Sequence, residues 1–136
     1  MKNLTFIFAL IFVSVSITYS QTPQSLQEQQ KAIFIQPVFQ VDDLIFSYNT
    51  LNTVEINGGE VDAFVEVRTL FADAIKSAQD KSKRGSDEVT VQMNILTAQN
   101  FFNLIARAKI TGAQADQYKR VQDAVTTAAK KLKENQ

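Results

Sequence analysis

A sequence pattern that occurs twice constrains the fold of this chain more than any other feature. Ile-Asn-Gly-Gly-Glu-Val-Asp-Ala-Phe-Val-Glu-Val at residues 56–67 is echoed by Ile-Thr-Gly-Ala-Gln-Ala-Asp-Gln-Tyr-Lys-Arg-Val at residues 110–121, an offset of 54 residues. Both copies keep a Gly-x-x-x-Asp spacing, which suits a turn followed by the acidic first turn of a helix. Such internal similarity indicates two diverged copies of one structural unit.

The apolar residues after each turn recur at intervals of three and four, the pattern of one face of a helix. The first stripe consists of Val61, Phe64, Val67, Phe71, Ala74, Ile75 and Ala78, and each member has a counterpart 54 residues later. Shorter stripes precede both turns, so we predict two helical hairpins, at residues 38–78 and 92–132. The first helix should begin near Pro37, and its core stripe consists of Val38, Val41, Leu44, Ile45, Tyr48 and Leu51. Because short connections make consecutive helices antiparallel, we expect an all-α, four-helix up-down-up-down bundle.

Three segments lie outside these stripes. Ser25-Leu26-Gln27-Glu28 matches a capping box, so we predict a short extra N-terminal helix from Leu26 to about Phe34. Apolar and polar residues alternate from Val89 to Met93, which favours an extended lead-in to the third helix. Residues 80–88 are charged or small and are typical of a linker between the halves.

The first twenty residues have the pattern of a secretory signal peptide. Lys2 precedes an apolar run at residues 4–15, and Thr18-Tyr19-Ser20 provides small residues before a cleavage site. The run is shorter than the roughly 20 residues that cross a bilayer, so cleavage is favoured over a retained anchor. We predict a signal peptide at 1–20, a single exported domain at 21–136 in a periplasm or outside the cell, and no stable membrane span after cleavage.

The composition argues against several classes of function. The chain has no His and no Cys, so the usual ligands of zinc, copper and haem are missing, and we predict no cofactor and no metal. Lys and Arg together number 14, as do Asp and Glu. Such a balance argues against binding nucleic acid through its phosphates.

Aromatic residues are the best candidates for binding. Phe39 and Phe46 fall on the side of their predicted helix that should be polar, so either the N-terminal helix covers them or they form a surface for a protein partner. Six further rings lie on predicted inner stripes. They are expected to fill the core or, if packing is loose, to line an apolar pocket: Tyr48, Phe64, Phe71, Phe101, Phe102 and Tyr118.

Two basic clusters follow the second and fourth predicted helices and should meet at one end of the bundle. They are Lys81, Lys83 and Arg84, and Lys130, Lys131 and Lys133. Cations at helix C-termini are expected from the helix dipole, so these clusters are weak evidence for an anionic partner.

The function that the sequence favours is binding, without catalysis, to another protein at the cell envelope or outside the cell. One alternative is a carrier of an apolar small molecule or lipid in the bundle interior. A carboxylate-based hydrolase using Asp42, Asp43, Glu60 and Asp62 is less favoured, because paired carboxylates need a cleft and a compact bundle of this size seldom has one.

Overall fold

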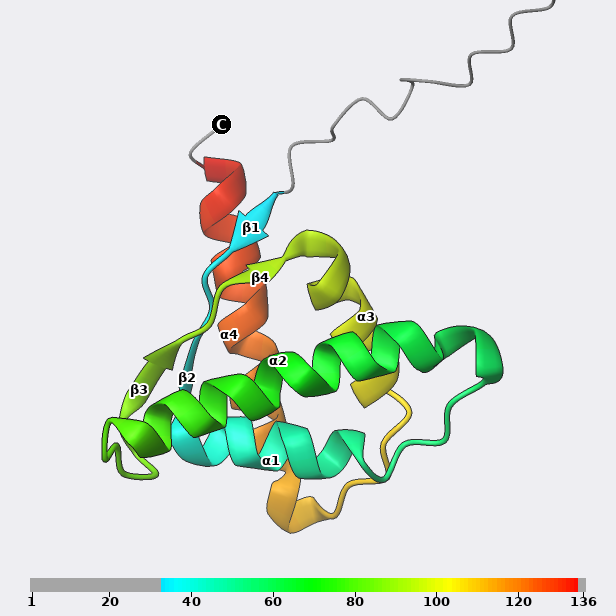
Figure 1. The fold of residues 1–136 in the computed structure, drawn as a ribbon, viewed down its shortest axis with the longest axis horizontal. Helices are drawn as coiled ribbons and strands as arrows, with labels where there is room; N and C mark the ends of the chain where they lie inside the picture. The colour runs from blue at the N-terminus through cyan, green and yellow to red at the C-terminus, as the bar shows by residue number, and fades with distance from the viewer. Residues whose placement is uncertain (1–32, 135–136) are drawn as a thin grey trace, which may run out of the picture.

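The computed structural model describes residues 33–134, which are mostly helical with a few short strands (Figure 1). The helices are α1 (Val41–Leu51), α2 (Val61–Asp80), α3 (Ile95–Ile105) and α4 (Ala115–Glu134), with short 3-10 helices η1 (Gly58–Glu60) and η2 (Gly112–Gln114). The strands are β1 (Phe34–Ile35), β2 (Val38–Gln40), β3 (Glu88–Thr90) and β4 (Met93–Asn94).

These elements recur at the spacing of the sequence repeat. α3, η2 and α4 begin and end 54 residues after α1, η1 and α2. The turn before each long helix is held in the same way. Asn57 and Glu60 form a reciprocal capping box at η1, and Thr111 and Gln114 form its counterpart at η2.

The strands pair between the two halves and not within them. β1 pairs antiparallel with β4, and β2 with β3. Between these ladders the Val91 N–H donates to the Pro37 carbonyl at 3.0 Å. Residues 37 and 91 are repeat counterparts, so a pseudo-twofold axis passes through this pair; proline has no N–H to donate the reciprocal bond.

The ribbon of strands also satisfies the first N–H groups of α1 and α3, which have no partner within their helices. The Val41 N–H donates to the Asp87 carbonyl at 3.1 Å, and the Ile95 N–H donates to the Ile33 carbonyl at 2.9 Å. These two bonds are repeat counterparts of each other. Each half therefore positions the first helix of the other half.

The core is asymmetric although the backbone is repeated. Phe71 of α2 and Phe101 of α3 pack with ring centroids 4.8 Å apart, and Phe39 of β2 packs edge-on against Phe71 at 5.7 Å. The counterparts of Phe71 and Phe101 are Val125 and Ser47, which are buried but much smaller. The bulky pair of phenylalanines therefore lies at the α2–α3 contact, and the α1–α4 contact has a serine and a valine at the two matching positions.

Several predicted elements need correction. Residues 38–40 form a strand, so the first hairpin helix begins at Val41, and part of the stretch from Val89 to Met93 is extended as the alternation indicated. Phe34 lies in β1, so the predicted N-terminal helix does not reach it. Ile33 is not helical either, and residues 26–32 of that helix and the predicted signal peptide lie outside the described residues.

The packing of the helices also departs from the predicted up-down-up-down bundle. Figure 1 shows α2 and α4 crossing steeply, whereas that bundle would make them parallel. Their C-terminal ends lie at different corners of the molecule, so the two basic clusters do not meet at one end. The difference arises because the paired strands join the two halves and set how their helices cross. The spacing of apolar residues along a helix does not reveal this pairing.

Candidate functional site

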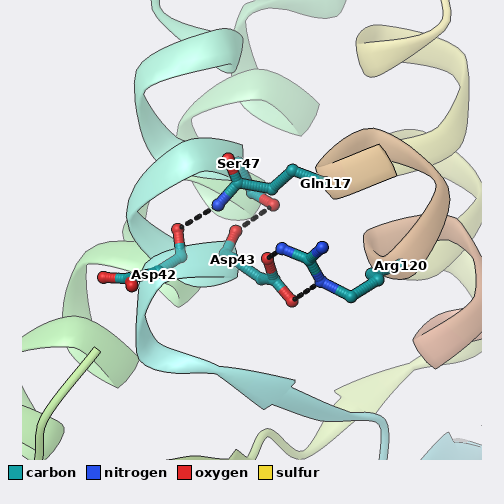
Figure 2. A network of polar contacts seen from close by, with 5 residues as sticks. All are labelled: Asp42, Asp43, Ser47, Gln117 and Arg120. Carbon is teal, nitrogen blue, oxygen red and sulfur yellow. Dashed lines mark hydrogen bonds and ion pairs between the residues drawn. The ribbon is translucent and has the colours of Figure 1, made fainter. Parts of the chain in front are cut away.

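The α1–α4 contact contains a buried carboxylate. Asp43 of α1 is only 3% exposed. Arg120 of α4 donates to both of its carboxylate oxygens, from Nη2 at 2.9 Å and from Nε at 3.3 Å (Figure 2). Burying an unpaired carboxylate costs free energy, so this bidentate pairing with Arg120 is what allows Asp43 to be buried.

The Arg120 side of this pair keeps its charge at physiological pH. The hydrogen bond to Asp43, and next the negative charge of Asp43, raise the pKa of the Arg120 guanidinium above its ordinary value. A guanidinium is already protonated throughout that range, so Arg120 does not act as a proton donor or acceptor. Its role here is to hold α4 against α1.

Two further hydrogen bonds extend this polar network, as Figure 2 shows. The Ser47 hydroxyl donates to the Asp43 carbonyl at 2.7 Å, and the Gln117 amide donates from Nε2 to the Asp42 carbonyl at 3.0 Å. The Asp42 carboxylate points away from Arg120. The network therefore fixes the first turns of α1 against α4 and leaves one carboxylate at the surface.

Two open clefts border the network. The β2–α4 cleft, of about 330 Å³, contains the ion pair in its wall; it is lined by Gln36, Val38, Phe39, Gln40, Asp43, Glu88, Arg120, Asp123, Ala124, Thr127, Ala128 and Lys131. The α1–η2 cleft, of about 500 Å³, is lined by Asp42, Ile45, Phe46, Asn49, Thr50, Thr53, Lys109, Ile110, Gln114 and Gln117.

The lining of the α1–η2 cleft combines apolar and polar side chains. Ile45 is 37% exposed and Ile110 is 36% exposed, whereas Phe46, which also lines the cleft, is 8% exposed. Asp42 and Lys109 have opposite charges, and within residues 33–134 neither takes part in an ion pair. Protein-binding surfaces usually combine apolar side chains with polar ones.

The equivalent location in the other half is bridged. There Arg107 donates from Nη1 to Glu60 Oε2 at 3.0 Å. Arg107 and Glu60 are the repeat counterparts of Thr53 and Gln114, which line the α1–η2 cleft. The Asn57 backbone N–H, and next the Arg107 side chain, lower the pKa of Glu60. Gln99 stands where Ile45 stands, so this location is both spanned by an ion pair and more polar.

Both rings of the predicted partner surface are buried. Phe39 is 2% exposed because it belongs to β2 and packs on Phe71, and Phe46 lies on the buried face of α1. Of the two alternatives for these rings, the partner surface is therefore wrong, because the apolar stripe was drawn through Ile45, which the structure exposes. Phe39 borders the β2–α4 cleft and Phe46 the α1–η2 cleft.

The six rings considered for an apolar pocket take part in the core. Phe71 and Phe101 are fully buried, and the half-buried Tyr48, Phe64, Phe102 and Tyr118 pack against the core cluster. None of the six lines either of the two clefts.

The four carboxylates considered for a hydrolase do not share one arrangement. Asp43 is bound by Arg120 and Glu60 by Arg107, while Asp42 and Asp62 are exposed. Within the described part of the chain, no three carboxylates lie close enough together to hold a metal ion.

The Asp43–Arg120 pair escaped sequence analysis because its members are 77 residues apart. A signal was nevertheless present in the repeat. The counterparts of Asp43 and Arg120 are Thr97 and Glu66, and the Thr97 hydroxyl donates to a Glu66 carboxylate oxygen. The same two positions therefore contact each other in both halves. Between the copies Asp43 is replaced by Thr97 and Arg120 by Glu66, and this paired replacement indicates the contact.

Comparison with protein-family models, with curated proteins and with solved structures gives no match for this chain. Across residues 33–134, no helix combines the length and the apolar character needed to cross a membrane.

Proposed function

We propose that this chain is an exported, non-enzymatic binding protein and that it binds a partner protein at the α1–η2 cleft. The observation that carries the proposal is the pair of exposed isoleucines, Ile45 and Ile110, which line the cleft together with Phe46 and several polar residues. The predicted signal peptide supports a partner at the cell envelope or outside the cell. The balanced charge of the chain favours protein over nucleic acid.

The cleft is the centre of the proposed interface and not the whole of it. Fully burying an isoleucine side chain contributes about 1.5–3 kcal/mol, and only about a third of each side chain is still exposed. Association costs at least about 4 kcal/mol in lost freedom of motion. The partner must therefore contact the surrounding polar surface as well, over a total buried area of about 1,000 Å² or more.

The repeat supplies an internal argument for this location. Both halves have the same backbone here, but one half is closed by the Arg107–Glu60 ion pair and the other keeps Thr53 and Gln114, which do not bridge. A purely structural role would be served equally well by either arrangement. The open arrangement, with Ile45 in place of a glutamine, is the one suited to a partner.

Transplanting the bridge tests the proposal. In the double variant Thr53→Arg/Gln114→Glu, an ion pair like that of the other half spans the cleft, and Glu at residue 114 preserves the capping box as Glu60 does. In pull-downs from envelope and culture-supernatant fractions, we expect a protein captured by the wild-type chain to bind this variant at least tenfold more weakly. The melting temperature should stay within a few degrees.

The matched control is the double variant Arg107→Thr/Glu60→Gln, which removes the bridge in the other half and leaves the α1–η2 cleft unchanged. It should capture the same protein with wild-type affinity. If both double variants bind equally, the cleft is not the binding site. A captured protein that responds to neither change does not support the proposal.

The carrier alternative receives less support from the geometry. Its six candidate rings pack against the core, with Phe71 and Phe101 in direct contact, and line neither cleft. Native mass spectrometry of the purified chain distinguishes the two functions, because a carrier should retain an apolar molecule of defined mass.

A further inference from the structure

We propose that two copies of this chain exchange halves, so that residues 33–80 of each copy pack against residues 88–134 of the other. The partner in this interaction is a second copy of the chain. The surface that it meets is the boundary between the two halves, which is closed in a single copy.

The contacts that join the halves can all be remade between two copies. Both strand ladders pair a strand of the first half with a strand of the second. The Phe71–Phe101 ring contact and the Arg120–Asp43 ion pair cross the same boundary. Residues 81–87 link the halves covalently, so exchange alters the contacts within this short segment and those it makes with α1, where the Asp42 N–H donates to the Gly85 carbonyl at 2.9 Å.

This linking segment contains a turn in which one residue, Ser82, has an unfavourable backbone conformation. α2 ends in a Schellman motif, in which the Lys83 N–H donates to the Ala78 carbonyl at 3.0 Å and the Ser82 N–H to the Gln79 carbonyl at 2.8 Å. Ser82 has φ 54°, and among residues 33–134 no other non-glycine residue has a positive φ. Glycine usually fills this position, because a Cβ disfavours the left-handed conformation.

Opening the turn removes this strain and allows α2 to continue. Lys81, Lys83 and Arg84 are good helix formers, and Gly85 is the first residue that opposes a longer helix. Figure 1 shows the segment as a compact loop between α2 and β3. An extended α2 would carry the chain past this loop, away from its own second half and toward that of another copy.

Concentration decides between the two forms. A short flexible linker holds the halves of one chain at an effective concentration on the order of millimolar. The single copy therefore dominates in dilute solution, and the dimer increases with concentration and with strain in the turn. Strained hinge segments favour such exchange in general.

A pair of substitutions at Ser82 tests the role of strain. The chain from Gln21 to Gln136 is incubated over a range of concentrations, and its dimer fraction is measured by size-exclusion chromatography with light scattering. Ser82→Gly should weaken the dimer and Ser82→Val should strengthen it, each by roughly tenfold or more, since two turns open per dimer. Ser82 is exposed, so neither change alters the core. Equal dimer fractions in all three chains overturn the proposal.

Engineered cysteines distinguish exchange from a dimer formed through an outer surface. Val38 and Thr90 are directly opposed in the β2–β3 ladder, both are exposed, and the chain has no cysteine of its own. In the Ser82→Val background, mixing the single variants Val38→Cys and Thr90→Cys should give disulfide-linked dimers joined through the two variant positions.

The double variant Val38→Cys/Thr90→Cys is the control. Oxidised in dilute solution, its disulfide ties the two halves of one chain together, so it should remain a single copy when concentrated. Dimers formed by this locked chain, or a mixture of single variants that yields no mixed disulfide, contradict exchange.

Discussion

The α2–α3 and α1–α4 contacts occupy equivalent places in two copies of one unit, yet they are stabilised by different chemistry. At α2–α3, Phe71 packs on Phe101, and the Arg107–Glu60 bridge closes the outer end. At α1–α4, the positions that match Phe71 and Phe101 hold Val125 and Ser47, the buried Asp43 carboxylate pairs with the half-exposed Arg120, and two open clefts lie beside the contact. One contact is built for stability, and the other keeps accessible polar and apolar surface.

The difference has an energetic meaning. Each fully buried aromatic ring contributes about 1.5–3 kcal/mol through the apolar surface it removes from water. A buried ion pair contributes far less net stability, because the loss of hydration offsets the attraction between the charges. What Asp43 and Arg120 supply is a fixed alignment of α1 and α4, since any other alignment leaves a charge buried without its partner. We infer that the aromatic side stabilises the fold and leaves the polar side free to diverge.

The largest expected effect comes from the aromatic side. Phe101→Ala should lower the free energy of unfolding by about 3–5 kcal/mol, through lost burial and the cavity left beside Phe71. The counterpart change Ser47→Ala removes one hydrogen bond and should cost only about 0.5–1.5 kcal/mol. Urea denaturation followed by far-UV circular dichroism measures both. Similar losses for the two variants would contradict the division of roles.

A smaller effect is expected at the ion pair. Arg120→Met leaves the Asp43 carboxylate buried without its partner, and we expect a loss of about 1–3 kcal/mol. The loss stays below that of a fully buried pair because the Arg120 side chain is 49% exposed and water can enter from the cleft. Denaturant midpoints provide the measurement.

The double variant Asp43→Thr/Arg120→Glu sharpens this prediction. It copies the Thr97–Glu66 hydrogen bond of the other half into the same backbone positions. It should recover most of the stability that Arg120→Met loses. Failure to recover would show that the two contacts are not interchangeable, despite their matching places in the repeat.

The sequence was sufficient to predict the repeat and its helices, because both depend on local patterns. The two turns and the long stripes after them are read from neighbouring residues, and α2 and α4 lie where those stripes indicate. The strands were not predictable in the same way. Buried and exposed residues alternate from Phe34 to Phe39, but the exposed residues Phe34 and Val38 are apolar. The sequence therefore lacks the alternation of apolar and polar residues that would predict a strand.

The candidate site was less accessible to sequence analysis than the fold. Phe39 and Phe46 were singled out by their place on an assumed helix beginning near Pro37, and the start of that helix depends on strands paired with the other half. Ile45 looked like a core residue for the same reason. Long-range pairing decides which face of α1 is buried, and no local pattern records it.

The smallest expected effect concerns the bridge that closes the aromatic side. The pKa of Glu60 is lowered by the Asn57 N–H and by Arg107, so Glu60 stabilises the folded state above its unfolded pKa of about 4.5. That contribution should be lost as the pH falls below 4.5 and through the lower folded-state value. Glu60→Gln should therefore flatten the decline of melting temperature below pH 4.5, whereas Gln114→Glu should steepen it by placing a carboxylate in the equivalent capping box. Because both sites are at the surface, each shift should be a few degrees at most, and a decline unchanged in both variants would mean that the bridge adds nothing to the stability of its side.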